Sequence, residues 1–238
     1  MSQRDFLGAF VPLKYLLMAT VGTLTYPGFA LLNRLHIRGG EHLLSLPDRG
    51  VLFVSNHQTY FTDVIALYHI FAAVRNGHRE SLGNPLYLFN LKVNVYYVAA
   101  EETMRSGTIP RLLAYSGAVM TRRVWREGAR DVSRTARLPD YASIGHAIDA
   151  GWVITFPQGT TTPFAKGRRG VCHIIRQFRP IVIPVVIDGF AKVFRKKGLI
   201  FRKVGHDLTV RFKPPISFSD PTNADSMLQE IMTAIEQV

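Results

Sequence analysis

His57 and Asp63 are the residues whose types and spacing most clearly indicate chemistry. His57 follows the apolar run at residues 51–54, within the tetrapeptide Asn-His-Gln-Thr, and Asp63 follows six positions later. An imidazole exchanges protons near neutral pH, and a neighbouring carboxylate fixes its tautomer and stabilises the imidazolium. The pair therefore predicts a general base. A capping aspartate beside a core histidine is the alternative interpretation.

The elements around this pair must bring the two side chains together. Residues 51–55 read as a short buried strand and residues 64–74 as a helix, because the first run is short and apolar and the second has helical spacing. On one continuous helix, positions six apart would lie roughly 240° apart. The pair is therefore expected in the strand-to-helix turn, with Asp63 at or near the N-cap.

A second segment ends an apolar run in a polar, cationic loop. Residues 151–156 read as a strand that stops at Pro157, Gln158 and Gly159. Cations and hydroxyl groups suit phosphate or carboxylate recognition, so this loop is a candidate site for an anionic group. Its hydroxyl and cationic side chains are Thr160, Thr161, Thr162, Lys166, Arg168 and Arg169.

Together these two segments resemble the glycerolipid acyltransferase family, typified by bacterial lysophosphatidic acid (1-acyl-sn-glycerol-3-phosphate) acyltransferase. The hallmarks of that family are an N-H-x-S/T start with a downstream Asp, and an F-P-E-G-T block. Residues 113–123 look like its glycine-to-arginine block, and residues 181–187 look like its final V-P strand. The four blocks occur in order, and the resemblance covers most of the chain, from about Ile37 to Phe212.

The resemblance implies an O-acyltransferase of phospholipid biosynthesis. It would move a fatty acyl group from a thioester co-substrate, acyl-CoA or acyl carrier protein, to the hydroxyl of a lyso-lipid, above all 1-acylglycerol-3-phosphate. His57 would take the hydroxyl proton in a direct ternary-complex transfer, with Asp63 as its orienting partner. Backbone amides near Gly159 and Thr160 are candidates for stabilising the oxyanion. No cofactor is expected.

We expect the cationic and polar side chains of the same blocks to bind the headgroup of the acceptor. Three positions depart from the family pattern: five residues separate His57 from Asp63 where four are usual, Gln158 replaces a glutamate, and Thr161 replaces an arginine. The two neutral side chains leave open an aminolipid acceptor of the lyso-ornithine or lyso-glycine kind. An inactive, basic, membrane- or lipid-binding protein is the alternative from another class. The candidate substrate-binding residues are Arg123, with Arg122 as its alternative, Gln158, Gly159, Thr160, Lys166 and Arg168.

Charge and composition narrow the partners. The 29 Lys and Arg residues exceed the 17 Asp and Glu residues, which gives a net charge of +12 and indicates an anionic partner. A membrane surface, an acidic carrier protein and a nucleic acid all fit this charge. No nucleic acid partner is expected, because the sequence has neither a paired-cysteine zinc pattern nor an aromatic RNA-recognition signature. The arginines spaced along residues 122–137 predict either a solvated helix face or a contact with lipid headgroups.

The single cysteine and the histidines indicate no metal chemistry. Cys172 excludes an internal disulfide, and its apolar neighbours predict a structural role for it. The histidines outside the His57 motif lack metal-ligand spacing, so we expect no catalytic metal.

The first 35 residues form a separate section. Residues 15–32 contain no charged side chain, yet several small and polar residues make the run weakly hydrophobic. A membrane span, a surface-lying helix and a buried core helix all remain possible. We expect a membrane-associated helical segment at residues 1–35 and an acyltransferase domain at residues 36–238. The expected location is the cytoplasmic face of a membrane, the inner membrane in a bacterium.

The order of predicted elements gives the fold class. Strands at residues 51–55, 93–99, 151–156, 181–187 and 208–212 alternate with helices at 64–74, 109–115, 141–150 and 170–179. This alternation predicts an α/β domain with a central, mostly parallel or mixed sheet flanked by helices. A C-terminal helix is expected to start at Asp220 and Pro221.

Overall fold

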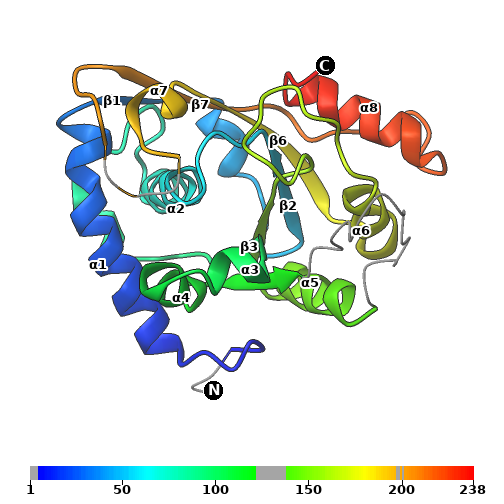
Figure 1. Cartoon of the computed structure of the whole chain (residues 1–238), viewed down its shortest axis with the longest axis horizontal. Coiled ribbons are helices and arrows are strands. Elements are labelled where there is room, and N and C mark those ends of the chain that lie inside the picture. The colour runs from blue at the N-terminus through cyan, green and yellow to red at the C-terminus, as the bar shows by residue number, and fades with distance from the viewer. Residues whose placement is uncertain (1–4, 122–137, 197–198, 200) are drawn as a thin grey trace.

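The protein is built on one seven-stranded sheet (Figure 1). The computed structural model describes residues 5–121, 138–196, 199 and 201–238. The strands lie in the order β1-β7-β6-β2-β5-β3-β4. Their bounds are β1 Arg34–Arg38, β2 Val51–Ser55, β3 Val95–Ala100, β4 Ala118–Thr121, β5 Trp152–Thr155, β6 Ile181–Asp188 and β7 Asp207–Phe212.

Helices cover both faces of this sheet and a further helix lies along one side. The α-helices are α1 Val11–Ala30, α2 Thr62–Arg75, α3 Glu101–Met104, α4 Thr108–Ala114, α5 Leu138–Ala150, α6 Gly170–Phe178, α7 Phe190–Val193 and α8 Ala224–Ala234. The described chain also has two 3₁₀ helices: η1 Gly40–Leu43 lies between β1 and β2, and η2 Pro85–Phe89 lies between α2 and β3. The predicted α/β class with flanking helices is confirmed.

The sheet contains both parallel and antiparallel strand pairs. From β6 through β2, β5 and β3 to β4, neighbouring strands pair in parallel, whereas β7 pairs antiparallel to β6 and parallel to β1. Parallel strands need helical crossovers and are covered on both faces, which explains why every residue of β2 is buried. The carboxyl ends of β2, β3, β4, β5 and β6 therefore share one edge, which is where ligands bind in open α/β sheets.

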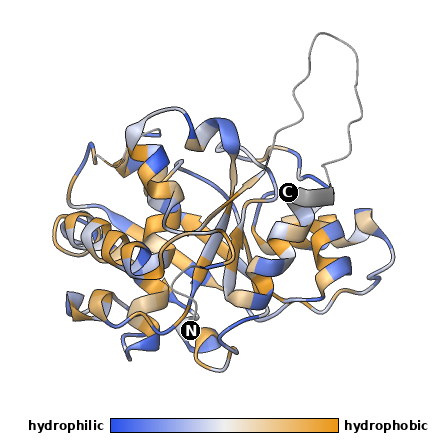
Figure 2. Cartoon of the chain, turned by 90° about the horizontal axis from the view of Figure 1, so that it is seen from below, coloured by the Kyte–Doolittle hydropathy of each residue, from blue (hydrophilic) through white to orange (hydrophobic). Residues whose placement is uncertain are grey.

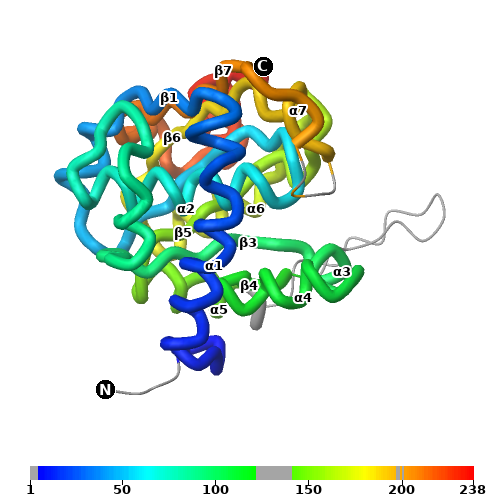
Figure 3. Tube along the Cα trace, turned by 90° about the vertical axis from the view of Figure 1, so that its left-hand side faces the viewer, coloured from blue at the N-terminus to red at the C-terminus, as the bar shows by residue number. Residues whose placement is uncertain are grey.

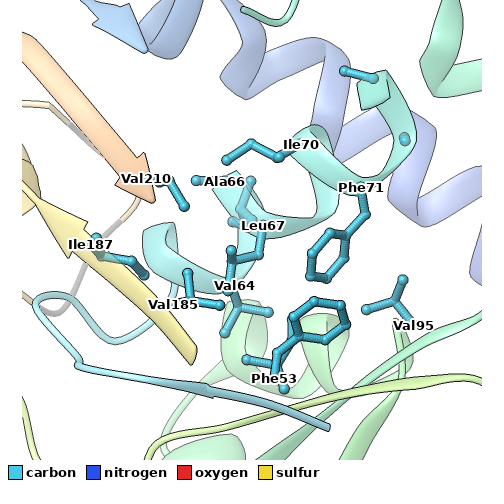
Figure 4. Close-up of a cluster of buried hydrophobic side chains, with 14 of the residues drawn as sticks. Phe53, Val64, Ala66, Leu67, Ile70, Phe71, Val95, Val185, Ile187 and Val210 are labelled. Atoms are coloured by element: carbon cyan, nitrogen blue, oxygen red, sulfur yellow. The ribbon is translucent and has the colours of Figure 1, made fainter. Parts of the chain in front are cut away.

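Two hydrophobic layers hold the helices onto the sheet. On one face α2 packs against the strands, and Phe71 of α2 meets Phe53 of β2 (Figure 4). The ring centroids of Phe53, Phe71 and Trp152 lie 4.5 to 5.2 Å from one another. On the other face α5, α6 and α8 contribute buried residues that include Ile148 and Ile231. Apolar residues dominate the central strands (Figure 2).

The C-terminal helix begins later than the sequence indicates. Asp220 closes a turn in which its carboxylate accepts hydrogen bonds from the amide and hydroxyl of Thr222. Asn223 is the N-cap, because its side chain accepts the amides of the first turn, and α8 starts at Ala224. Cys172 is buried against this start and donates a hydrogen bond to the Ala224 carbonyl at 3.3 Å. Burial raises the pKa of its thiol, in accord with the structural role predicted for it.

Helix α1 has one face on the domain and one face in solvent. Its inner face packs against α2 and η2 and buries Phe29 completely. On its outer face Leu16, Leu24 and the capping Leu31 are 64%, 76% and 71% exposed. At about 100° per residue these three positions fall within roughly 80° of one another, so they form a single apolar stripe. Within the residues that the structure describes, no helix combines the length and the apolar character needed to cross a bilayer.

A buried histidine links α1 to the domain. The Nε2 atom of His69, on α2, lies 3.0 Å from the Thr25 hydroxyl of α1, and its Nδ1 atom lies 2.8 Å from the Tyr87 hydroxyl of η2. The Thr25 hydroxyl donates to the Val21 carbonyl, so it accepts from Nε2–H while Tyr87 donates to Nδ1. This arrangement suits a neutral imidazole, and burial lowers the pKa of His69 to about 3.

The buried His69 makes stability depend on pH. Between the folded pKa of about 3 and the ordinary value of 6.5, the unfolded chain binds a proton that the folded chain does not, so stability falls as pH falls through that window. At pH 5 the expected loss is about 2 kcal/mol relative to pH 8. Urea unfolding of the wild type and of His69→Gln at both pH values measures it. A pH dependence that is equal in the two proteins would contradict this assignment.

Candidate active site

His57 and Asp63 meet in the turn between β2 and α2. The Nδ1 atom of His57 lies 2.9 Å from Oδ2 of Asp63, although one more residue separates them than the family pattern has. Asp63 is the second residue of α2 and is fully buried, whereas the His57 side chain keeps 13% of its surface exposed. The turn therefore holds an imidazole that solvent or a substrate reaches on one side and a carboxylate fixes on the other.

Four hydrogen bonds hold the Asp63 carboxylate. Besides His57, the backbone amides of Gln58 and Thr59 donate to Oδ2 at 2.6 and 3.0 Å, and the Thr59 hydroxyl donates to Oδ1 at 2.5 Å. Thr59 also contacts the hydroxyl of Thr62. A buried carboxylate is stable only when it is fully hydrogen-bonded, and here every partner is a donor that stabilises the ionised form. Asp63 thus presents an anion to Nδ1 of His57.

The sheet fixes the start of this turn. Asn56 is buried, its Nδ2 donates to the Ile187 carbonyl at 2.8 Å, and its Oδ1 accepts the Ile187 amide at 2.7 Å. This side chain therefore continues the β2–β6 pairing by one residue after β2 has ended. The Gln58 side chain accepts the amide of Ala191 at 3.1 Å, just after β6. His57 is held between two residues that are both tied to the same strand end.

The ring of His57 lies beside aromatic side chains that the motif did not identify. Phe156 stacks on it with a centroid distance of 3.9 Å and an interplanar angle of 22°, and the ring of Tyr60 is nearly parallel to it, at 19°, with its centroid 6.5 Å away. One signal was available in the sequence: if β2 and β5 are neighbours in register, as Val54 and Thr155 are, residues 57 and 156 reach the same sheet edge. Stacking by Phe156 limits rotation of the imidazole and covers one of its faces.

His57 opens into a cavity of about 360 Å³ at the carboxyl ends of the strands. Most of its wall is apolar, with Tyr97, Met104 and Ile144 among the lining residues, and its polar side chains include Thr160 and Arg168. A smaller apolar cavity of about 40 Å³ lies under α1 and α2. The two cavities share three lining residues: Tyr60, Val64 and Tyr97.

Comparisons with known proteins give a family and a similar fold. The model of the family described as Acyltransferase matches residues 34–188, which span β1 to β6 and include the His57 turn. The chain belongs to the acyltransferase family. No curated protein sequence matches it. The crystal structure of the 1-acyl-sn-glycerophosphate (LPA) acyltransferase PlsC from Thermotoga maritima has a similar fold, with a TM-score of 0.57 and 17% identity over 92% of this chain and 77% of that one.

In this acyltransferase the candidate headgroup residues occupy different surroundings. Arg168 is exposed and lines the cavity, where its guanidinium lies against Gly159. Lys166 is exposed but is not among the described lining residues. Arg169 forms two hydrogen bonds of 2.7 Å with the Asp225 carboxylate. Of the cations that follow β5, Arg168 is therefore the one positioned to meet a substrate.

Gln158 is buried, and its side chain forms hydrogen bonds within the protein. It is 2% exposed, and its Nε2 donates to the Ala165 carbonyl at 2.9 Å and to Oε1 of Gln237 at 3.2 Å. These bonds join the loop after β5 to the C-terminal end of the chain. The structure thus gives Gln158 a structural task and places it outside the described cavity lining.

The two backbone amides proposed to stabilise the oxyanion differ in whether they already donate a hydrogen bond within the protein. The Gly159 amide donates to the Phe156 carbonyl at 2.9 Å and closes the turn, with Gly159 at a φ of +62°. The Thr160 amide donates no such bond within the described residues, and Thr160 lines the cavity. The neighbouring Thr161 hydroxyl is buried and has no hydrogen-bond partner in the described part of the chain. This loop therefore leaves Thr160 and Thr161 as donors for a bound group.

Two further expectations concern the arginines and metals. Arg122 and Arg123, together with the other arginines of residues 122–137, lie outside the described residues, and their assignment to the headgroup stays a prediction. Among the residues described, no group of three histidine, cysteine or acidic side chains is placed to hold a metal ion.

Proposed function

We propose that this acyltransferase moves a fatty acyl group from a thioester to the hydroxyl of a lyso-lipid at a membrane surface. The observation that carries the proposal is the His57–Asp63 pair, whose imidazole faces a largely apolar cavity at the carboxyl ends of the strands. The acceptor best supported by the family is 1-acylglycerol-3-phosphate, in phospholipid biosynthesis. Acyl-CoA or acyl carrier protein would supply the acyl group.

The geometry assigns the proton transfer to Nε2 of His57. Because Nδ1–H donates to Asp63, the lone pair of the neutral ring is on Nε2. As the acceptor oxygen attacks the thioester carbonyl, its proton passes to Nε2, and Asp63 stabilises the imidazolium. The tetrahedral intermediate then expels the thiolate, which takes the proton back from His57. The products are the ester and the free thiol, and no acyl-enzyme is formed.

The loop after β5 would stabilise the negative charge on the tetrahedral oxygen. The Thr160 amide is the candidate donor, since the Gly159 amide is already bonded to Phe156. Preorganised donors in a cavity that excludes water are among the largest contributions to acyl-transfer catalysis. The stacked Phe156 helps to exclude water from the site, because it covers one face of the imidazole.

The position of α1 supports reaction at a lipid surface. This helix packs into the domain on one face and exposes leucines on the other, and exposed apolar side chains of this kind form a surface that acyl chains can cover. A lyso-lipid acceptor and a diffusing thioester donor would then meet His57 from the membrane and from the aqueous phase. The cytoplasmic face of the membrane is proposed together with these donors.

A panel assay tests this function. Purified protein in detergent is given acyl-CoA or acyl carrier protein donors together with lysophosphatidic acid, lyso-ornithine lipid and lyso-glycine lipid, and the ester products are identified by mass spectrometry. Turnover of lysophosphatidic acid is the expected result. The aminolipid alternative rests on the neutral Thr161, which lines the cavity, and selective turnover of an aminolipid would establish it in place of the phosphate acceptor. Absence of His57-dependent ester formation with every pair would contradict an enzymatic role.

Arg168 provides a prediction about the acceptor. We expect Arg168→Ala to lower kcat/KM for an anionic acceptor by roughly 10- to 100-fold, because one charge-assisted contact is lost. The donor KM should not change. Lys166→Ala is the matched control, since Lys166 is equally exposed in the same loop but lies outside the described cavity lining. Equal kinetics for the two variants would remove Arg168 from the site.

A further inference from the structure

A basic hairpin lies between β6 and β7, beyond the end of the family match at residue 188. Phe194 and Phe201 form an antiparallel bridge, and the Arg202 amide donates to the Val193 carbonyl at 2.6 Å. We call the described residues of 191–204 the basic hairpin. It packs on the C-terminal half of α1 (Figure 3). The ring of Phe29 there lies 5.3 Å from that of Phe194.

The hairpin carries cations that have no counter-charge within the described chain. All five are exposed, and no described carboxylate lies within salt-bridge distance of any of them. Unpaired like charges held close together repel one another unless an anionic partner neutralises them. These cations are Lys192, Arg195, Lys196, Arg202 and Lys203.

Apolar side chains are exposed beside these cations. Phe201 and Val204 of the hairpin are 38% and 56% exposed, and Leu31 at the end of α1 is 71% exposed. Backbone bonds hold the two segments together, since the Gly205 amide donates to the Leu32 carbonyl at 2.7 Å. The apolar stripe of α1 therefore continues onto the hairpin and is flanked there by positive charge.

The hairpin also touches the turn that carries His57. The Tyr60 amide donates to the Lys196 carbonyl at 2.9 Å, and the Gln58 side chain accepts the Ala191 amide at 3.1 Å. Tyr60 in turn lines both cavities. Two backbone-level contacts thus connect the cationic surface to the catalytic turn.

We propose that the basic hairpin is a docking surface for an anionic phospholipid bilayer, and that it sets the catalytic turn at the height of the headgroups. The inference rests on the membrane-surface reaction proposed above and adds the site that recognises lipid charge. A bilayer satisfies both halves of this surface, because its headgroups neutralise the cations while its acyl region covers Phe201, Val204 and the leucine stripe. An acidic protein would pair with the cations and leave the leucine stripe of α1 in water.

Vesicle binding by the full-length protein tests the proposal. The triple variant Lys192→Gln, Arg195→Gln, Lys196→Gln is compared with wild type on phosphatidylcholine vesicles and on vesicles in which about a third of the lipid is phosphatidylglycerol. Each charge removed should weaken binding to the anionic vesicles about fivefold, so the triple variant should bind roughly 100-fold more weakly. Binding to the neutral vesicles should not change. A triple variant that keeps the charges, Lys192→Arg, Arg195→Lys and Lys196→Arg, should retain the wild-type affinity.

Three exposed cations elsewhere supply the matched control. Arg49 lies two residues before β2, and Arg176 and Arg179 lie at the end of α6, on the face of the sheet opposite α2. Their triple Gln variant should bind anionic vesicles about as well as wild type. Equal weakening in the two triple variants would overturn the proposal, because net charge alone would then explain it. Unchanged vesicle binding with lost binding to acyl carrier protein would also overturn it, in favour of an acidic partner.

A variant of α1 separates this inference from the proposed function. Leu16→Ser with Leu24→Ser should weaken binding to neutral and anionic vesicles alike, since it removes apolar contact and no charge. If this variant loses binding and the hairpin variant does not, the membrane-surface reaction stands and only the hairpin assignment fails. If neither variant loses binding, the membrane-surface proposal fails as well.

Discussion

Replacing His57 with alanine should lower turnover by about 10² to 10⁴-fold, because the acceptor hydroxyl would lose the base that takes its proton. The fold should survive, since the His57 side chain is partly exposed and Asp63 keeps the two amides and the hydroxyl that also hold it. Initial rates at saturating donor and acceptor measure the loss, and thermal unfolding checks that the variant is folded.

The protein provides its own control for this variant. His36 forms a second histidine–aspartate pair with Asp207 at 3.0 Å, but both side chains are exposed and lie away from the cavity. His36→Ala should retain activity within about twofold of wild type, as expected of a surface ion pair. If His57→Ala also stayed within a few-fold of wild type, His57 would not be the base.

Asp63→Asn should reduce turnover by roughly 10² to 10⁴-fold, as a neutral amide in this position favours the wrong imidazole tautomer and does not stabilise the imidazolium. The buried carboxylate accepts four hydrogen bonds, and an asparagine would turn an NH₂ group towards at least one of those donors. Some loss of thermal stability should therefore accompany the loss of turnover.

The readout that separates these two effects is kinetic. Removal of the partner of His57 should lower kcat at saturating substrate and leave the donor KM nearly unchanged, whereas a loosened turn would raise both KM values. Asp207→Asn is the parallel control in the exposed pair. Full activity of Asp63→Asn would show that another group orients the imidazole.

The elements that place His57 and Asp63 were predictable because their signals are local. An apolar run of four residues shortly before His57 gives β2, and helical spacing after Asp63 gives α2. The start of α8 was predicted wrongly at Asp220, since Asp-Pro also begins turns, and Asn223 supplies the actual cap. Local patterns thus identify an element more reliably than they locate its ends.

The surroundings of the pair depend on contacts between distant segments. Phe156 reaches His57 only because β5 inserts next to β2, and Asn56 meets Ile187 only because β6 occupies the other side of β2. The use of Gln158 to hold Gln237 follows from where the chain's last residues pack, which no motif encodes. The sequence therefore indicates which residues do chemistry more readily than which residues support them.

The anchoring of the turn on both sides has a consequence for how such proteins are identified. Asn56 is clamped to β6 and Asp63 is clamped by the amides of Gln58 and Thr59, so the imidazole and carboxylate meet at 2.9 Å across one more residue than is usual. The backbone between Asn56 and Asp63 accommodates the extra residue while both anchors keep their hydrogen bonds. A search pattern that demands a fixed count between histidine and aspartate would discard this chain, whereas one written around the strand end and the helix start would retain it.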